Sequence, residues 1–180
     1  SCAEDAIVWS SGFLAGMTTV GYLASQHEHI WVAPGTHPAV LPGQVAIRQH
    51  ESWYAWKTWC REEAERLPAS TILILSNSVE VLHPAVHDFD WVNLLPKKHN
   101  YTMLLDDSHG FGVLGNDIFG SYACWNHLPV NLIVSGSLGK GLSLPAGIIL
   151  GRKEILEKIR MTATYRGASP PPPAYLFAML

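Results

Sequence analysis

The sequence has little cysteine, little charge and no long apolar run, and each shortage excludes a class of protein. Its three cysteines (Cys2, Cys60 and Cys124) are odd in number and far apart, which fits neither a disulfide framework nor a zinc pair. Charged residues make up 15% of the chain and the longest basic cluster is Lys97-Lys98, so we expect no nucleic-acid partner. No apolar run reaches the roughly 20 residues of a membrane span and no signal peptide is recognisable, so we expect a cytoplasmic protein without a membrane span.

The residues that are present predict a folded core. Of the 180 residues, 48% are hydrophobic, and the chain has seven Trp and five Phe. Disordered chains are rich in charge and poor in aromatic residues, so this composition excludes disorder. The formal net charge is −3, from 12 basic and 15 acidic side chains. We therefore expect one globular domain or a large piece of one.

Short apolar runs alternate with helical stretches along the chain. Continuous runs of this kind are typical of strands that are buried on both faces, as in a mostly parallel sheet. The alternation predicts an α/β fold in which helices make the crossovers between parallel strands. The predicted strands are Ala6–Trp9, Ile30–Ala33, Val45–Ile47, Thr71–Ser76, Tyr101–Leu105, Asn131–Val134 and Gly147–Leu150, and the predicted helices are Gly12–Ser25, Ser52–Leu67 and Lys153–Tyr165.

Small and polar residues follow the predicted strands. In open α/β sheets, ligands bind beyond the carboxyl ends of the strands, so these segments are the candidates for a site. They contain two acids, two histidines and a lysine. The segments are Ser10–Phe13, Gly35–His37, Asn77–Ser78, Asp106–His109 and Ser135–Lys140.

Three familiar motifs can be set aside. Gly110–Gly115 has the spacing G-x-G-x-x-G of a dinucleotide-binding motif. However, a polar insert separates it from the preceding strand, and no acidic residue ends the next strand. We therefore expect a glycine-rich turn and no dinucleotide site. Gly136–Ser143 fails as a P-loop because Val134 stands where a glycine is needed and Gly141 follows Lys140. No metal site is expected, because two groups lack a third ligand at a recognised spacing: His27-Glu28-His29, and His83 and His87 with Asp88.

Lys140 lies in a glycine-rich turn after a buried strand, and Asp106 ends another strand. An amine and a carboxylate at the ligand edge of a sheet are what pyridoxal 5′-phosphate (PLP) chemistry needs. The lysine forms a Schiff base with the aldehyde, and the acid keeps the pyridine nitrogen protonated. Ser11–Phe13 opens a helix, whose free N–H groups suit a phosphate. The residues therefore favour PLP as the cofactor.

Four segments resemble motifs of the α-oxoamine synthases, a group of fold-type-I PLP enzymes. Asp106–Gly115 and Gly136–Gly141 resemble two of its signatures, Ser11–Phe13 its phosphate-binding turn, and Thr36–Ala39 its histidine motif. The resemblance extends from about residue 5 to residue 175. It implies PLP, an amino-acid substrate, an acyl-CoA and a homodimer. It also implies that residues 1–180 are the central part of the PLP-binding large domain, without the N-terminal arm and the C-terminal small domain.

The resemblance implies a catalytic role for four residues. Lys140 would form the Schiff base and then act as the base that removes a substrate proton. Asp106 would pair with the pyridinium nitrogen and His109 would hydrogen-bond the ring hydroxyl. His37 would stack on the ring face.

Five further residues would bind the phosphate. Ser11 and the backbone amides of Gly12 and Phe13 form the phosphate turn, and Ser137 would add its side chain. Ser169 resembles a residue that reaches the phosphate of the partner subunit's cofactor.

One departure from the family pattern keeps the reaction type open. By an ungapped count from Asp106, a serine that contacts the ring hydroxyl in the family is replaced by Val81. Three hypotheses remain: an α-oxoamine synthase-like acyltransferase, a PLP-dependent aminotransferase of the same fold, and a catalytically silent α/β binding module. A requirement for CoA, a half-reaction with glutamate or alanine, or the lack of bound cofactor would distinguish them.

Overall fold

A computed structural model of the chain describes residues 3–43, 46–82 and 85–177. Three residues that the sequence predictions involve lie outside the described residues: Cys2, Val45 of one predicted strand, and His83.

A six-stranded sheet in the order β1-β8-β7-β6-β3-β2 forms the centre of the molecule. The pairs β2–β3, β3–β6 and β6–β7 are parallel, whereas β8 runs antiparallel to both of its neighbours, β1 and β7. The predicted α/β fold with a mostly parallel sheet is therefore confirmed. The strands are β1 (Asp5–Trp9), β2 (His29–Val32), β3 (Thr71–Asn77), β6 (Asn100–Asp106), β7 (Asn131–Ser137) and β8 (Gly147–Gly151).

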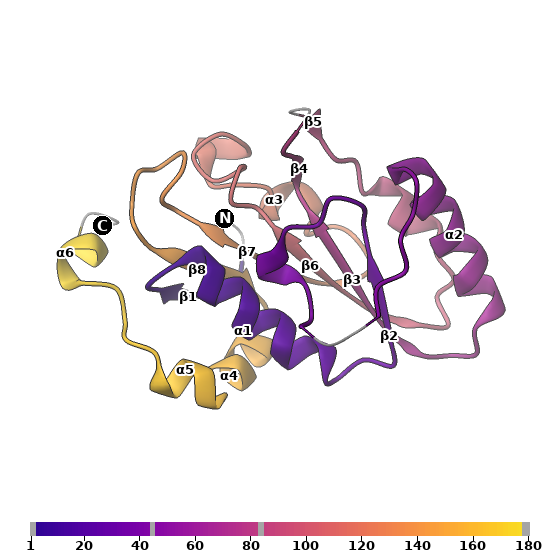
Figure 1. Ribbon diagram of the computed structural model, residues 1–180, viewed down its shortest axis with the longest axis horizontal. Coiled ribbons are helices and arrows are strands. Elements are labelled where there is room, and N and C mark those ends of the chain that lie inside the picture. Colours follow the sequence, from indigo (N-terminus) through magenta and orange to yellow (C-terminus); the bar gives the residue numbers. More distant parts are fainter. Residues whose placement is uncertain (1–2, 44–45, 83–84, 178–180) are drawn as a thin grey trace.

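Helices cover both faces of the sheet (Figure 1). α1 (Gly12–Ala24) and α4 (Lys153–Arg160) pack on one face, over a core that includes Leu73, Leu104 and Ile133. α2 (Trp53–Arg66) packs on the other face with an aromatic layer of Trp31, Trp56, Phe89 and Trp91. Burial on both faces explains why β3 and β6 read as continuous apolar runs.

Short elements connect these layers. They are the 3-10 turns η1 (Pro38–Val40), η2 (Asp90–Leu94) and η3 (Asn116–Ile118), the two-stranded hairpin β4 (Val79–Glu80) and β5 (Ala85–Val86), and the helices α3 (Tyr122–Trp125), α5 (Ala163–Gly167) and α6 (Pro173–Phe177).

Serine side chains cap the first turns of α1 and α2. The Ser11 Oγ accepts a hydrogen bond from the Leu14 N–H at 3.2 Å, and the Ser52 Oγ accepts one from the Ala55 N–H at 3.1 Å. α2 ends at Arg66, before Pro68, which cannot continue a helix. α1 and α2 are confirmed to within one residue at each end.

Two predicted elements are wrong in part. Ala46 and Ile47 form no strand; Ile47 packs as a partly buried side chain on the core beneath α1. The single helix predicted for Lys153–Tyr165 is broken into α4 and α5. Thr162 adopts an extended backbone and its Oγ1 accepts a hydrogen bond from the Tyr165 N–H at 3.2 Å, which begins a new helix.

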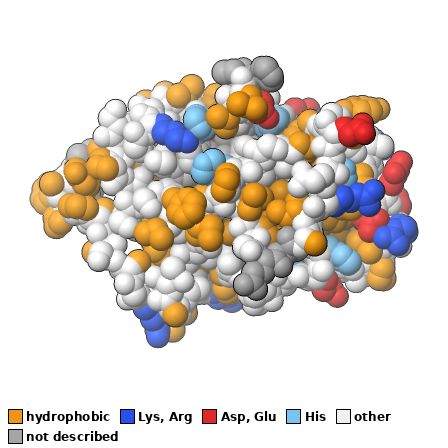
Figure 2. Space-filling view, viewed as in Figure 1, with side chains coloured by type: hydrophobic (Ala, Val, Ile, Leu, Met, Phe, Trp, Pro, Cys, Tyr) orange, Lys and Arg blue, Asp and Glu red, His pale blue; other side chains and the backbone are white. Residues whose placement is uncertain are grey.

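Across the described ranges, no helix is long and apolar enough to cross a membrane. Among the same residues, no group of three or more His, Cys, Asp and Glu side chains is placed to hold a metal ion. Figure 2 shows apolar side chains gathered across the middle of the face that α1 covers, with charged side chains at the end occupied by α2.

Candidate functional site

Three polar residues lie side by side at the carboxyl edge of the sheet. Asn77 of β3 pairs with Asp106 of β6, and Asp106 pairs in turn with Ser135 of β7. The apolar runs of the three strands bring these side chains to one level, where a ligand of an open α/β sheet binds.

Asp106 is buried, at 7% exposure, and only one of its oxygens receives a hydrogen bond. Oδ1 accepts the Ser108 N–H at 2.9 Å. Oδ2 lies 3.5 Å from His37 Nδ1. That nitrogen already accepts the Ala39 N–H at 3.1 Å, so it carries no proton to donate to Asp106. No described residue donates a hydrogen bond to Oδ2, which is therefore ready for a proton-bearing ligand atom.

His37 is held beside Asp106 by Asn77, a residue to which the sequence assigned no role. The Asn77 Oδ1 accepts the His37 N–H at 2.9 Å, and its Nδ2 donates to the Gly35 carbonyl at 2.8 Å. Both bonds are made by a side chain that is 5% exposed, so they are shielded from water. Asn77 thus fixes the loop that presents His37.

Lys140 and His109 contact each other above this edge. Lys140 Nζ lies 2.8 Å from His109 Nε2, so the amine donates a hydrogen bond to the ring. Partial burial, followed by the charge of Lys140, lowers the pKa of His109 below its usual value. A neutral His109 is the form that can accept this hydrogen bond and hold the amine in place.

The N-terminus of α1 lies against the end of β7. A Cβ added to Gly12 would be 2.5 Å from the Cα and N of Ser137, so only glycine permits this approach. The N–H groups of Gly12 and Phe13 have no acceptor within the helix, as in the first turn of any α-helix. The two N–H groups therefore form the start of an anion site next to Ser137.

Ser137 is itself oriented by the loop after β6. Its N–H donates to the Ser108 Oγ at 2.8 Å, and its own Oγ accepts the Gly139 N–H at 3.1 Å. The hydroxyl hydrogen of Ser137 stays available for a ligand oxygen. Ser108 was not singled out by sequence, because a lone serine in a turn carries no pattern.

A second acid, Asp107, organises the same loop from inside. It is fully buried and accepts hydrogen bonds from the Ser78 hydroxyl and, at 2.6 Å, from the Ser121 N–H. Burial raises the pKa of Asp107 against the effect of these bonds. A Cβ on Gly110 would lie 1.9 Å from its Oδ1, so the glycine-rich turn is shaped around this carboxylate.

Ser169 and the Phe13 side chain do not join this group. Ser169 is exposed and lines a separate cavity of about 240 Å³ with Trp9 and Tyr165. Phe13 is 54% exposed, and only its backbone belongs to the first turn of α1. The contribution of Ser169 to a partner subunit stays a prediction.

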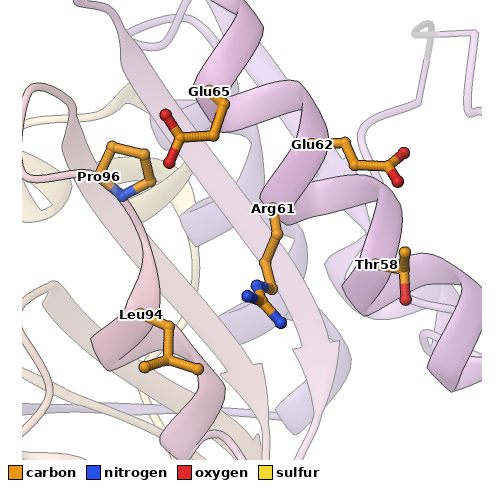
Figure 3. A pocket seen from close by; sticks show the side chains of 6 residues that line it. All are labelled: Thr58, Arg61, Glu62, Glu65, Leu94 and Pro96. Atoms are coloured by element: carbon orange, nitrogen blue, oxygen red, sulfur yellow. The ribbon is translucent and has the colours of Figure 1, made fainter.

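One cavity adjoins the candidate site at the sheet edge, and a second lies apart from it. One, of about 280 Å³, lies between the β4–β5 hairpin and the loop after β6, and His109 and Val81 both line it. The other, of about 360 Å³, lies on the outer side of α2, where Arg61 points toward Leu94 and Glu65 toward Pro96 (Figure 3). The second cavity contains no candidate site residue.

The residues at the sheet edge fit PLP. Asp106 Oδ2 lacks a hydrogen donor, which a protonated ring nitrogen would supply. The start of α1 and the Ser137 hydroxyl offer donors to a phosphate, and Lys140 offers a primary amine. A buried carboxylate, an anion site and an amine along one edge match the ring nitrogen, the phosphate and the aldehyde of the cofactor.

Comparisons with known proteins agree with this assignment. The family model for aminotransferase class I and II matches residues 86–180. The 8-amino-7-oxononanoate synthase of Burkholderia ambifaria is 26% identical over 99% of this chain and 39% of its own length. The chain therefore spans well under half of that curated relative.

Solved structures show the same fold. A serine palmitoyltransferase with a PLP internal aldimine superposes with a TM-score of 0.76 at 20% identity, over 97% of this chain and 45% of that one. The 8-amino-7-oxononanoate synthase of Francisella tularensis gives 0.70 at 23% identity, over 94% and 50%. The resemblance to α-oxoamine synthases, which the motifs predict, is confirmed by the fold of the chain and by the relatives that it matches.

Proposed function

The chain belongs to the aminotransferase class I and II family, and on that premise we propose that it holds PLP for an α-oxoamine synthase-like reaction. The reaction would condense an amino acid with an acyl-CoA. One observation carries the proposal: Asp106, Lys140 with His109, and the start of α1 lie along a single edge of the sheet. The similarity to 8-amino-7-oxononanoate synthases supports acyl transfer over transamination.

When bound, PLP supplies an aldehyde for an amine and a ring that withdraws electrons from the substrate Cα. Asp106 Oδ2 would accept a hydrogen bond from the protonated ring nitrogen and balance its charge. Lys140 Nζ would provide the amine that holds the cofactor and would accept a proton from the substrate Cα. His109 receives the Lys140 hydrogen bond in the present geometry and orients this amine.

The phosphate is held by the chain's own backbone. The N–H groups of Gly12 and Phe13 and the dipole of α1 attract the anion, and Ser11 caps the same turn. The Ser137 hydroxyl donates a further hydrogen bond. His37, fixed by Asn77 beside Asp106, would cover one face of the ring.

The exposed apolar residues of α1 support a homodimer. Phe13, Leu14 and Met17 are 54%, 37% and 36% exposed on one side of the helix, and burying them against a second copy would remove this apolar area from water. In such a dimer Ser169 would reach the partner's phosphate. The cytoplasmic location expected from the sequence likewise stays a prediction.

Cofactor binding and reaction type can be tested separately. PLP is added to the protein and its absorbance is titrated for wild type, Asp106→Asn and the exposed control Asp117→Asn. Asp106→Asn should weaken PLP binding, whereas Asp117→Asn should not, since asparagine tolerates the φ of +56° at that position.

The PLP-loaded protein is then given L-alanine and hexanoyl-CoA. Release of free CoA thiol only when both are present supports acyl transfer. Conversion of the cofactor by amino acid alone supports an aminotransferase, and PLP binding with neither reaction supports a binding module. Either of the last two results overturns the acyl-transfer assignment.

A further inference from the structure

The cavity between the β4–β5 hairpin and the loop after β6 adjoins the reactive amine. His109 forms part of its wall, and the Nε2 of His109 is 2.8 Å from Lys140 Nζ. A group bound in this cavity would therefore lie next to the atoms that the proposed function uses. The described residues that line it are Val79, Glu80, Val81, Ala85, Val86, His109, Val113 and Leu114.

The wall is mostly aliphatic and is open to solvent. Val81, Val86 and Val113 are 44%, 54% and 64% exposed, which is unusual for side chains that prefer burial. Figure 2 shows apolar, acidic and histidine side chains close together over the hairpin. The cavity has a volume of about 280 Å³. It can hold a short aliphatic group, which would cover the valines.

The lining of the cavity contains one negative charge, that of Glu80, and the Lys140 amine lies next to its His109 side. Glu80 is the one acid among the described lining residues, and none of them is a Lys or Arg. Its Oε2 lies 3.8 Å from the Nε2 of His87. Burial lowers the pKa of His87 despite this neighbour, so His87 forms no full ion pair with Glu80 at neutral pH, and the Glu80 Oε1 accepts a hydrogen bond from the Leu82 N–H at 3.2 Å. Burial and the neighbouring charge of Lys140 lower the pKa of His109, so its imidazole adds no positive charge to the wall.

We propose, resting on the proposed PLP function, that this cavity is the subsite for an uncharged aliphatic group of a substrate and that Glu80 excludes substrates with a carboxylate there. The aliphatic group can belong to the amino acid or to the acyl chain. In either case the hairpin valines attract it and the Glu80 carboxylate repels a second negative charge within the same cavity.

The test compares neutral and anionic probes on the PLP-loaded protein. L-leucine and L-glutamate are titrated by the change in cofactor absorbance, and hexanoyl-CoA and adipoyl-CoA by calorimetry. Wild type should bind the neutral member of at least one pair more tightly, and the pair that discriminates identifies the source of the group. Glu80→Gln should reduce that preference about tenfold, whereas Glu62→Gln, on the outer side of α2, should leave it unchanged.

A second variant acts on the apolar wall. Val113→Ala should weaken binding of the neutral probe several-fold and leave the anionic probe unaffected, because only the aliphatic contact is lost. Failure to load PLP at Lys140 would refute the proposed function itself. Normal loading with equal affinity for neutral and anionic probes, or with a preference that Glu80→Gln and Val113→Ala both leave intact, would refute the subsite alone.

Discussion

Gly12→Ala tests the contact on which the anion site depends. The added Cβ would lie 2.5 Å from the Cα and N of Ser137 and 2.7 Å from its Cβ. Two of these atoms are backbone, so no flexible side chain can move away, and the start of α1 has to shift from the end of β7. Overpacking of this kind costs about 1–3 kcal/mol.

The same shift moves the N–H groups of Gly12 and Phe13 relative to Ser137. An anion at a helix N-terminus is stabilised by about 0.3–2 kcal/mol, depending on its burial. Loss of most of this stabilisation should raise the Kd for PLP about tenfold, which corresponds to about 1.4 kcal/mol. Stability and PLP affinity should therefore fall together.

The chain contains a matched control in the same helix. Nothing lies within 4 Å of a Cβ added to Gly21. Gly21→Ala should stabilise the protein by about 0.5–1 kcal/mol through helix propensity and leave the Kd for PLP unchanged. Urea denaturation and PLP absorbance titration measure both quantities. A Gly12→Ala protein as stable as wild type, with unchanged PLP affinity, would refute the reasoning.

Three further substitutions probe the loops around the site. Asn77→Ala should destabilise the protein by about 1–3 kcal/mol and free the His37 loop, measured by urea denaturation and by amide hydrogen exchange of that loop. Asp107→Ala should cost about 3 kcal/mol in the same denaturation assay, because the Ser78 hydroxyl and a buried N–H lose their acceptor; a loss below 0.5 kcal/mol would contradict the role given to this acid. In the folded protein, burial lowers the pKa of His87 below its usual value of 6.5. As the pH falls, His87 of the unfolded chain therefore takes up a proton before His87 of the folded chain does. Wild type should lose stability below about pH 6.5 for this reason. His87→Phe keeps a ring to stack on Trp53 and should flatten this dependence, which a set of denaturation curves from pH 5 to 8 would reveal.

The fold could be predicted to a large extent because its strands are buried on both faces. Runs such as 71–76 and 101–105 are apolar apart from Thr71, Ser76 and Thr102, and the N-cap Ser52 and the helix-breaking Pro68 bound α2. The break between α4 and α5 could not be predicted, because the apolar spacing continues across it and Thr162 acts as a cap only in the folded chain. The hairpin β4–β5 is too short to show a period of two.

The site could be predicted where chemistry alone singles out a residue. Lys140, Asp106 and His109 are reactive groups at strand ends, and the structure places all three at one edge. Asn77 and Glu80 could not be assigned a role, because their importance arises from segments distant in sequence: Gly35 for Asn77, and the His109 loop that closes the cavity for Glu80.

The most direct test of the central claim is to locate the covalent attachment of the cofactor. The protein is incubated with PLP, reduced with borohydride, digested and mapped by mass spectrometry, beside Lys140→Ala and the exposed control Lys97→Ala. We expect a pyridoxyl group on Lys140 in wild type and in Lys97→Ala, and no stoichiometric labelling in Lys140→Ala. Labelling spread over surface lysines, or labelling that Lys140→Ala does not reduce, would contradict it.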